Sequence, residues 1–214
     1  MKVIDLTHAI TPDMPVYPGT EQPLFIPANS YEKDGFKETR ICMFSHTGTH
    51  MDPPAHLYKG RTTLDQFPID QFIGKALVID VRHLKEGEEI TMKEIQKYGN
   101  LPEKADFLLF NLGWDKKWGT DAYFGDYPCV DDEVLDYIMR GNYKGIGFDV
   151  IGLDPISDVD LVRHNKLFKD KDIVNIENLK NLDLCGSGLF SFSCFPLKTE
   201  AADGSPIRAV AWFD

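Results

Sequence analysis

A short segment of the chain concentrates residues with metal-binding chemistry. The run from His46 to His56, HTGTHMDPPAH, contains three of the six histidines and an aspartate within 11 of the 214 residues. Imidazole nitrogens and a carboxylate at such short spacing are ligands that divalent ions take in proteins, and a carboxylate can bind one ion or bridge two. The segment therefore predicts a metal site.

The composition of this segment favours a strand over a helix. Gly48 and the consecutive prolines at 53 and 54 are poor helix residues, and the prolines cannot donate ladder hydrogen bonds. We therefore expect a strand over residues 37–52. Because side chains alternate between the faces of a strand, one face carries His46, Gly48, His50 and Asp52. Gly48 leaves room for an ion between the two imidazoles, and His56 follows on a loop that could fold back over the site.

The same run resembles the signature of a known family. His46-x-Gly48-Thr49-His50-x-Asp52-x-Pro54-x-His56 is similar to the HxGTHxDxPxH motif of the cyclase family of metal-dependent hydrolases. That family includes bacterial kynurenine formamidases (arylformamidases) and isatin hydrolases. Residues 4–7 and 14–19 resemble the family's N-terminal segment, and residues 202–208 resemble its C-terminal signature. The resemblance therefore extends over most of the chain.

The resemblance implies a set of metal ligands. His46, His50 and Asp52 correspond to the ligands of a first ion, and Asp52 is able to bridge to a second. The family takes its remaining ligands from a later histidine and from a glutamate about a dozen residues beyond it. His164 and Glu177 fit those places.

The resemblance also implies two residues that act on the substrate. His56 corresponds to the family's catalytic acid/base. Tyr17 corresponds to an aromatic wall of the substrate pocket, where a kynurenine formamidase is expected to have Trp. Tyr17 therefore leaves the exact substrate open.

The elements that must position these residues are predicted from apolar runs and from capping signals. A capping box at Thr91 predicts a helix that stops before Gly99. A second helix is expected over residues 131–140, with Gly141 at its C-terminal end. A short helix is expected over residues 158–168 and carries His164. Residues 11–30 are interpreted as a loop because they are rich in proline and turn formers. Besides the motif strand, strands are expected over residues 1–6, 76–81, 106–110, 146–150, 173–176, 189–195 and 207–213.

This element order predicts an α/β fold that is rich in strand, with a central mixed sheet or open barrel flanked by a few helices. The resemblance implies a swivelling β/β/α arrangement of this sort. We expect one domain over residues 1–214. Because residues 46–56 and 164–177 are far apart in the chain, the fold must bring two strand ends together.

Composition narrows the range of partners and locations. Hydrophobic residues make up 43% and charged residues 27% of the chain, as in ordinary globular proteins. The net charge of −11 argues against nucleic acid or an anionic membrane as a partner. The chain has no transmembrane-length apolar run and no signal-peptide pattern, so a cytoplasmic location is expected. The four cysteines form no CxxC pair; Cys42, on the ligand face of the predicted strand, is interpreted as a buried structural thiol rather than a ligand.

These features together predict hydrolysis of an amide-like C–N bond in a small aromatic molecule, by a water that one or two divalent ions activate. Zinc is the first expectation and manganese is possible. One alternative is a cyclic amide of the isatin type, with the pocket around Tyr17 and Trp114 deciding between the two substrates. Another is a metal-binding or ligand-binding protein without turnover. The family resemblance also implies a homo-oligomer, either a dimer or a tetramer.

Overall fold

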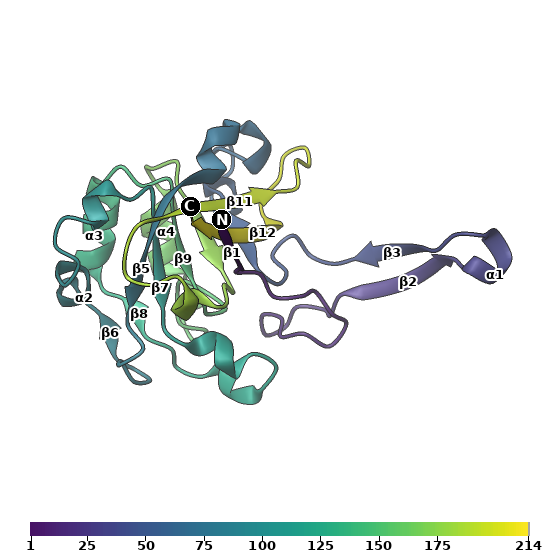
Figure 1. The fold of residues 1–214 in the computed structure, drawn as a ribbon, viewed down its shortest axis with the longest axis horizontal. Helices are drawn as coiled ribbons and strands as arrows, with labels where there is room; N and C mark the ends of the chain where they lie inside the picture. The colour runs from purple at the N-terminus through teal and green to yellow at the C-terminus, as the bar shows by residue number, and fades with distance from the viewer. Residues whose placement is uncertain (214) are drawn as a thin grey trace.

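A closed barrel of mixed strands forms the centre of the molecule (Figure 1). The computed structural model describes residues 1–213. The main sheet has eight strands, and all of them except β1 (Lys2–Asp5) close into a ring because β12 pairs with both β11 and β4. The strands of the ring are, in spatial order, β12 (Ser205–Phe213), β11 (Phe190–Pro196), β5 (Ile73–Asp80), β7 (Phe107–Asn111), β9 (Gly145–Phe148), β10 (Val174–Glu177) and β4 (His50–Asp52). The expected strand-rich α/β fold with a central mixed sheet is confirmed, and the sheet forms a closed barrel rather than an open one.

The barrel has apolar packing on both sides of its parallel strands. β5, β7, β9 and β10 run parallel to one another, whereas β11, β12 and β4 are antiparallel to their neighbours. In β7, Phe107 and Leu109 belong to the cluster that fills the barrel, and Leu108 and Phe110 belong to the cluster under the helices. This burial on both faces explains the continuous apolar run that marks β7 in the sequence.

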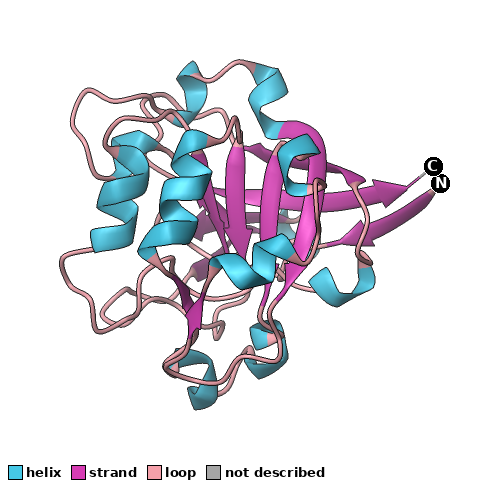
Figure 2. Ribbon diagram, turned by 90° about the vertical axis from the view of Figure 1, so that its left-hand side faces the viewer, coloured by secondary structure: helices cyan, strands magenta, loops and turns pink. Residues whose placement is uncertain are grey.

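Three helices pack over the outside of the parallel strands (Figure 2). They are α2 (Met92–Gln96), α3 (Asp132–Arg140) and α4 (Val162–Phe168). The predicted starts of the first two are confirmed, since Thr91 forms a capping box with Glu94 and the side chain of Asp131 accepts from the amide of Val134. Gly141 ends α3 with φ −73°, so it does not adopt the left-handed conformation of a common C-terminal cap.

Short connections complete the fold. β6 (Glu89–Ile90) pairs with β8 (Cys129–Val130) in a separate two-stranded sheet. Short 3₁₀ helices occupy Pro54–His56, Leu64–Gln66, Ile69–Phe72, Pro102–Lys104, Trp114–Lys117, Asp121–Phe124 and Leu182–Leu184. Within residues 1–213, no helix is long and apolar enough to cross a membrane.

A two-stranded arm projects from the barrel (Figure 1). It consists of residues 24–42: β2 (Leu24–Asn29), the one-turn helix α1 (Tyr31–Asp34) and β3 (Glu38–Cys42). Two predictions are wrong here. Residues 11–30 are not loop throughout, because β2 lies within them, and residues 37–52 do not form one strand, because β3 ends at Cys42 and β4 begins at His50. Cys42 is exposed on the arm, so its interpretation as a buried thiol is also wrong.

Candidate metal centre

Strands β4 and β10 present adjacent polar side chains on the outside of the barrel. In their antiparallel register, Glu177 lies opposite His50 and Asn175 lies opposite Asp52. Met51, between the two β4 residues, points into the apolar core of the barrel. The alternation expected for a strand is therefore confirmed for His50 and Asp52.

His46 reaches the same place from a loop rather than from the strand. Gly48 has φ +66°, and a Cβ at this position would lie 3.3 Å from Cε of Met14. Gly48 thus lies in a left-handed bend before β4, and the prediction that it leaves a gap between two imidazoles on one strand is wrong. The ring of His46 turns back so that Nδ1 lies 2.7 Å from Oδ1 of Asp52. Gly204 covers this ring so closely that a Cβ there would overlap the imidazole.

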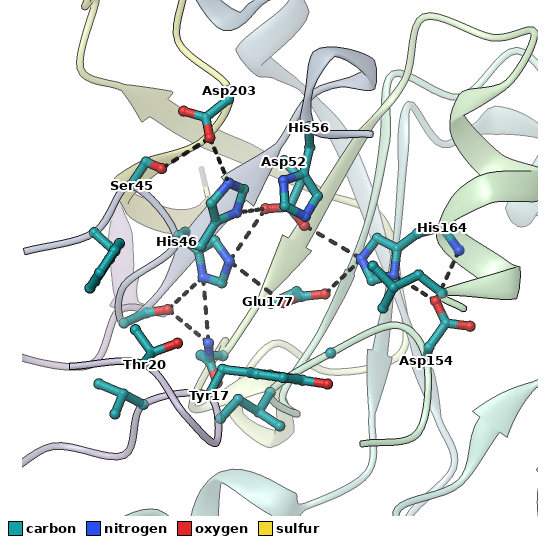
Figure 3. Close-up of a pocket in the computed structure, with 18 of the residues that line it drawn as sticks. Tyr17, Thr20, Ser45, His46, Asp52, His56, Asp154, His164, Glu177 and Asp203 are labelled. Carbon is teal, nitrogen blue, oxygen red and sulfur yellow. Dashed lines mark hydrogen bonds and ion pairs between the residues drawn. The ribbon is translucent and has the colours of Figure 1, made fainter. Parts of the chain in front are cut away.

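His164 and Glu177 lie beside the motif residues. His164 projects from α4, and its Nε2 lies 3.2 Å from Oε1 of Glu177 and 3.7 Å from Oδ2 of Asp52. The second oxygen of Glu177, Oε2, lies 3.5 Å from Nε2 of His50. Residues separated by more than a hundred positions in the chain therefore form one cluster (Figure 3).

The cluster contains two groups of donor atoms that share one carboxylate. His46, His50 and Asp52 form the first group, and Asp52, His164 and Glu177 form the second; within each group the donor atoms lie within 4.8 Å of one another. Oδ1 of Asp52 faces the first two imidazoles, and Oδ2 faces His164. This arrangement could hold two divalent ions with Asp52 between them.

The charges of the cluster favour a bound cation. Asp52 and Glu177 are buried, and among the described residues that line the pocket none is Lys or Arg. Burial lowers the pKa of His50, but Asp52 and Glu177 raise it more, to about 9. Burial also lowers the pKa of His164, but its hydrogen bonds with Asp154, Asp52 and Glu177 raise it well above its usual range. The two carboxylates thus favour the protonated, positively charged imidazoles. A bound divalent ion would provide this positive charge in place of the protons.

Two buried atoms of the cluster also lack partners. Nε2 of His46 and Oδ1 of Asn175 make no hydrogen bond, and Oδ2 of Asp203 lies 3.4 Å from Nε2 of His46. Buried polar groups in folded proteins are nearly always paired. Three imidazoles and two carboxylates are also a donor set that zinc and similar divalent ions accept. The residues present therefore fit a metal ion.

His56 lies beside the cluster with a free imidazole. It ends the 3₁₀ turn Pro54–His56, and its ring centroid lies 4.0 Å from that of His46. Among the hydrogen bonds of residues 1–213, none involves its ring. Burial lowers its pKa, so the ring is neutral near pH 7 and can accept a proton. With His46 and Asp203 it also forms a third group of close donor atoms.

A cavity of about 540 Å³ opens over the cluster. Tyr17 lines it and is 38% exposed, and burial together with the charge of Glu177 raises the pKa of its phenol. In Figure 3 Tyr17 and His56 lie on opposite sides of Glu177. Trp114 does not line the cavity: its ring is buried, and its Nε1 donates to the carbonyl of Tyr123. The expectation that Trp114 shapes the pocket is therefore wrong.

Sequence reasoning missed two residues that hold the cluster in place. Oδ2 of Asp154 lies 2.6 Å from Nδ1 of His164 and also accepts the backbone amide of His164, so it orients that ring. Nδ2 of Asn175 donates to Oε1 of Glu177 at 2.8 Å and to Oδ2 of Asp52 at 3.1 Å. Asn175 precedes Glu177 by two residues, so the period of the strand could have identified it. The contact of Asp154 depends on how α4 docks, and spacing gives no signal for it.

Comparisons with known proteins agree with this geometry. The Cyclase family model matches residues 4–155. Kynurenine formamidase of Bacillus anthracis is 32% identical over 98% of this chain and 96% of its own length. Isatin hydrolase A from Labrenzia aggregata, solved with benzyl benzoate, has a TM-score of 0.84 at 24% identity and covers 98% of this chain and 93% of its own. A predicted metal-dependent hydrolase from Bacillus stearothermophilus has a TM-score of 0.79 at 26% identity over 98% of this chain and 97% of its own.

Proposed function

The chain belongs to the cyclase family, and from this premise we propose that it is a metal-dependent hydrolase that cleaves an amide-like C–N bond in a small aromatic molecule. The observation that carries the proposal is the pair of donor groups sharing Asp52, with the unpaired imidazole of His56 beside them. A structural metal site needs no free acid/base, whereas hydrolysis of an amide does.

The proposed ligands are His46, His50 and Asp52 for one ion and Asp52, His164 and Glu177 for a second. Zinc is the proposed metal, with manganese as the alternative, because the set mixes three imidazoles with two carboxylates. When bound, such an ion would lower the pKa of a water to about 7 and polarise a carbonyl oxygen. Asp154 and Asn175 keep the ligands in place through the contacts described above.

The chain's own residues then supply the proton transfers. His56 is neutral near pH 7, so its ring can take the proton released when water adds to the carbonyl carbon. The same ring can return that proton to the leaving nitrogen, which would otherwise depart as an unstable anion. His56 returns to its neutral form at the end of the cycle, as a catalyst must.

Tyr17 supports an aromatic substrate. Its ring lines the cavity, and the nearby Pro15 and Pro18 restrict the backbone of the segment that carries it. An aromatic ring in this place can stack on a planar molecule. The resemblance to kynurenine formamidases supports an aryl formamide, which has a planar ring next to the cleaved bond. A small molecule of this size fits a cavity of about 540 Å³.

The test is a substrate panel with metal-stripped protein reconstituted with zinc or manganese. The proposal predicts metal-dependent release of formate from aryl formamides, with aliphatic formamides cleaved more slowly. Ring opening of lactams instead of formate release would place the protein with cyclic amide hydrolases. Tight metal binding without turnover on any formamide, lactam or ester would contradict the proposal and leave a binding protein.

A further inference from the structure

Asn178, directly after the proposed ligand Glu177, is a buried polar residue to which the proposed chemistry gives no role. Its side-chain amide makes two short hydrogen bonds: Nδ2 donates to the carbonyl of Gly48 at 2.8 Å, and Oδ1 accepts from the hydroxyl of Tyr123 at 2.7 Å. The same carbonyl of Gly48 lies 2.8 Å from Nδ1 of His50. Asn178 is therefore linked through one backbone oxygen to an imidazole of the first donor group.

The carbonyl of Gly48 determines where His50 carries its proton. A carbonyl oxygen only accepts hydrogen bonds and has two lone pairs, so Nδ1 of His50 and Nδ2 of Asn178 both donate to it. The proton of a neutral His50 ring is then on Nδ1, and the free lone pair is on Nε2. This Nε2 lies 3.3 Å from Oδ1 of Asp52 and 3.5 Å from Oε2 of Glu177, on the side of the other donor atoms. A hydrogen bond at one ring nitrogen of a histidine thus fixes which nitrogen can bind an ion.

Tyr123 in turn fixes the orientation of the Asn178 amide. Its side chain is fully buried in the cluster under the helices, and its hydroxyl reaches Oδ1 of Asn178 from there. If the amide were turned over, Oδ1 would face the carbonyl of Gly48, and two acceptors would oppose each other. The hydroxyl of Tyr123 therefore begins a chain of hydrogen bonds that runs from the core to His50.

The backbone of Asn178 is held as firmly as its side chain. Its φ is +56°, a left-handed value that asparagine adopts more readily than most residues. Its amide donates to the carbonyl of Val150 at 2.9 Å, and its carbonyl accepts from Oγ1 of Thr49 at 2.6 Å. This conformation would by itself favour an asparagine here, so a test must separate the backbone from the side chain.

We propose that Asn178 is a positioning residue of the metal centre, whose amide holds the carbonyl of Gly48 where it keeps the proton of His50 on Nδ1 and leaves Nε2 free for an ion. The inference rests on the proposed metal-dependent function. Among the hydrogen bonds of residues 1–213, none joins Asn178 to His164. Removing the amide should therefore weaken the ion held by His50 and spare the ion held by His164.

The first test is zinc affinity, measured by competition with a chromophoric chelator. Asn178→Gly is the sharpest variant, because glycine adopts a φ of +56° without strain and only the side chain is lost. The binding step that is missing in His50→Ala should weaken by about 10- to 100-fold, the usual effect of losing a group that orients a ligand, while the step that requires His164 stays unchanged. Asn178→Asp, which places an oxygen against the carbonyl of Gly48, should lose at least as much affinity.

Tyr123→Phe removes only the hydroxyl and should weaken the same step by about 2- to 10-fold, the contribution of one hydrogen bond. Tyr143→Phe is the matched control and should bind zinc as wild type does, because Tyr143 is also buried and its hydroxyl donates to the carbonyl of Pro102 instead. Calorimetric melting of the stripped proteins shows that each variant folds. If Asn178→Gly does not fold, the difference between the two tyrosine variants decides, and equal affinities would contradict the proposal.

The second test observes the proton of His50 itself, by NMR of zinc-loaded protein that contains isotope-labelled histidine. In wild type and in Tyr143→Phe, the ring of His50 should carry a proton on Nδ1 that exchanges slowly with water. In Asn178→Gly this signal should broaden or vanish. A wild type that binds no zinc would contradict both the proposed function and this inference. A wild type that binds zinc, with the same affinity and the same His50 signal in the Asn178 variants, would contradict this inference alone.

Discussion

The two oxygens of Asp52 face different imidazoles, so this residue contributes to both donor groups, whereas His164 contributes to one. We expect Asp52→Ala to lose bound zinc at both positions and His164→Ala to lose it only at the position that includes Glu177. The measurement is zinc per chain by mass spectrometry after dialysis at a fixed free zinc concentration. Equal zinc content in the two variants would show that Asp52 does not bridge.

His56 combines a lowered pKa with the absence of any ring hydrogen bond among the described residues. We expect His56→Ala to reduce kcat by about 10²–10⁴-fold, the usual contribution of a general acid/base, while zinc content stays the same. Its ring is also close to His46 and Asp203, which allows a different role as a ligand. If the variant lost zinc and its remaining rate followed zinc content, His56 would be a ligand instead.

Tyr17 offers the substrate a ring and a hydroxyl at the side of the cavity away from His56 (Figure 3). Stacking on such a ring contributes roughly 0.5–1.5 kcal/mol, so Tyr17→Ala should raise KM for aryl substrates about 2- to 10-fold without changing zinc content. Tyr17→Phe keeps the ring and serves as the control that isolates the hydroxyl. An unchanged KM for the alanine variant across an aromatic panel would remove Tyr17 from the binding site.

At the scale of elements, the sequence predicts what local signals determine. Strand β7 follows from its apolar run, and helices α2 and α3 follow from the capping residues Thr91 and Asp131. The alternation of β4 correctly placed His50 and Asp52 on one face. These features depend on residues that are neighbours in the chain, which is why pattern reasoning finds them.

Features that depend on contacts between residues far apart in the sequence were not predicted. The loop that carries His46 is shaped by the turn at Gly48 and covered by Gly204, which is more than 150 residues away in the chain. The period of a strand contains no information about such a contact. The strands of the arm were not predicted for a related reason. Pro27 and the turn formers around β2 are typical of a loop when the pairing partner of the strand is not known.

Asp149 is a buried acid that holds the backbone after β7 in place, and its contribution to the free energy of unfolding depends on pH. It follows β9, and its two oxygens accept the amides of Leu112 and Trp114 after β7, at 2.8 and 2.9 Å. Burial raises its pKa from 3.8 to about 7, so between these values the folded state binds more protons than the unfolded state. The contribution of Asp149 to stability therefore falls as pH rises from about 4 to 7, by at most about 1.4 kcal/mol per pH unit.

Urea unfolding between pH 5 and 7 tests this relation. The free energy of unfolding of wild type should fall with pH relative to Asp149→Asn, whose side chain does not titrate. Asp80→Asn is the control, because hydrogen bonds from Arg82 hold the pKa of Asp80 below its usual value and its titration lies under this window. Parallel pH profiles for wild type and Asp149→Asn would contradict the assignment.

At the scale of the whole molecule, closure of the barrel creates the site. The pairing of β4 with β10 joins Asp52 to Asn175, and the pairing of β4 with β12 completes the ring. Neither pairing can be read from the chain, because β4 has only three residues and its partners are distant in the sequence. The family resemblance, and not the pattern of residues, pointed to His164 and Glu177.

Closure also gathers buried carboxylates and imidazoles, which makes the stability of the whole molecule depend on metal and pH. Without metal, the pKa of His50 is raised from 6.5 to about 9 and that of His164 is raised well above its usual range, so their protonation stabilises the folded state. The part due to His50 is fully present below about pH 6.5 and is lost as pH rises through about 9. A metal ion competes with these protons, so its affinity should increase with pH in the same window, by up to about tenfold per pH unit for each proton displaced.

We therefore expect zinc to raise the melting temperature more at pH 8.5 than at pH 6.5, at equal free zinc. An ion present at about 100 times its Kd stabilises the fold by about 2.7 kcal/mol, so an increase in affinity at constant free zinc is visible as a larger shift. The measurement is differential scanning calorimetry of stripped and zinc-loaded protein at both pH values, with His50→Ala and His83→Ala as test and matched control. His83 lies outside both donor groups, so its variant should keep the wild-type difference, whereas His50→Ala should lose most of it. A zinc-induced shift that is the same at both pH values would contradict proton competition at the site.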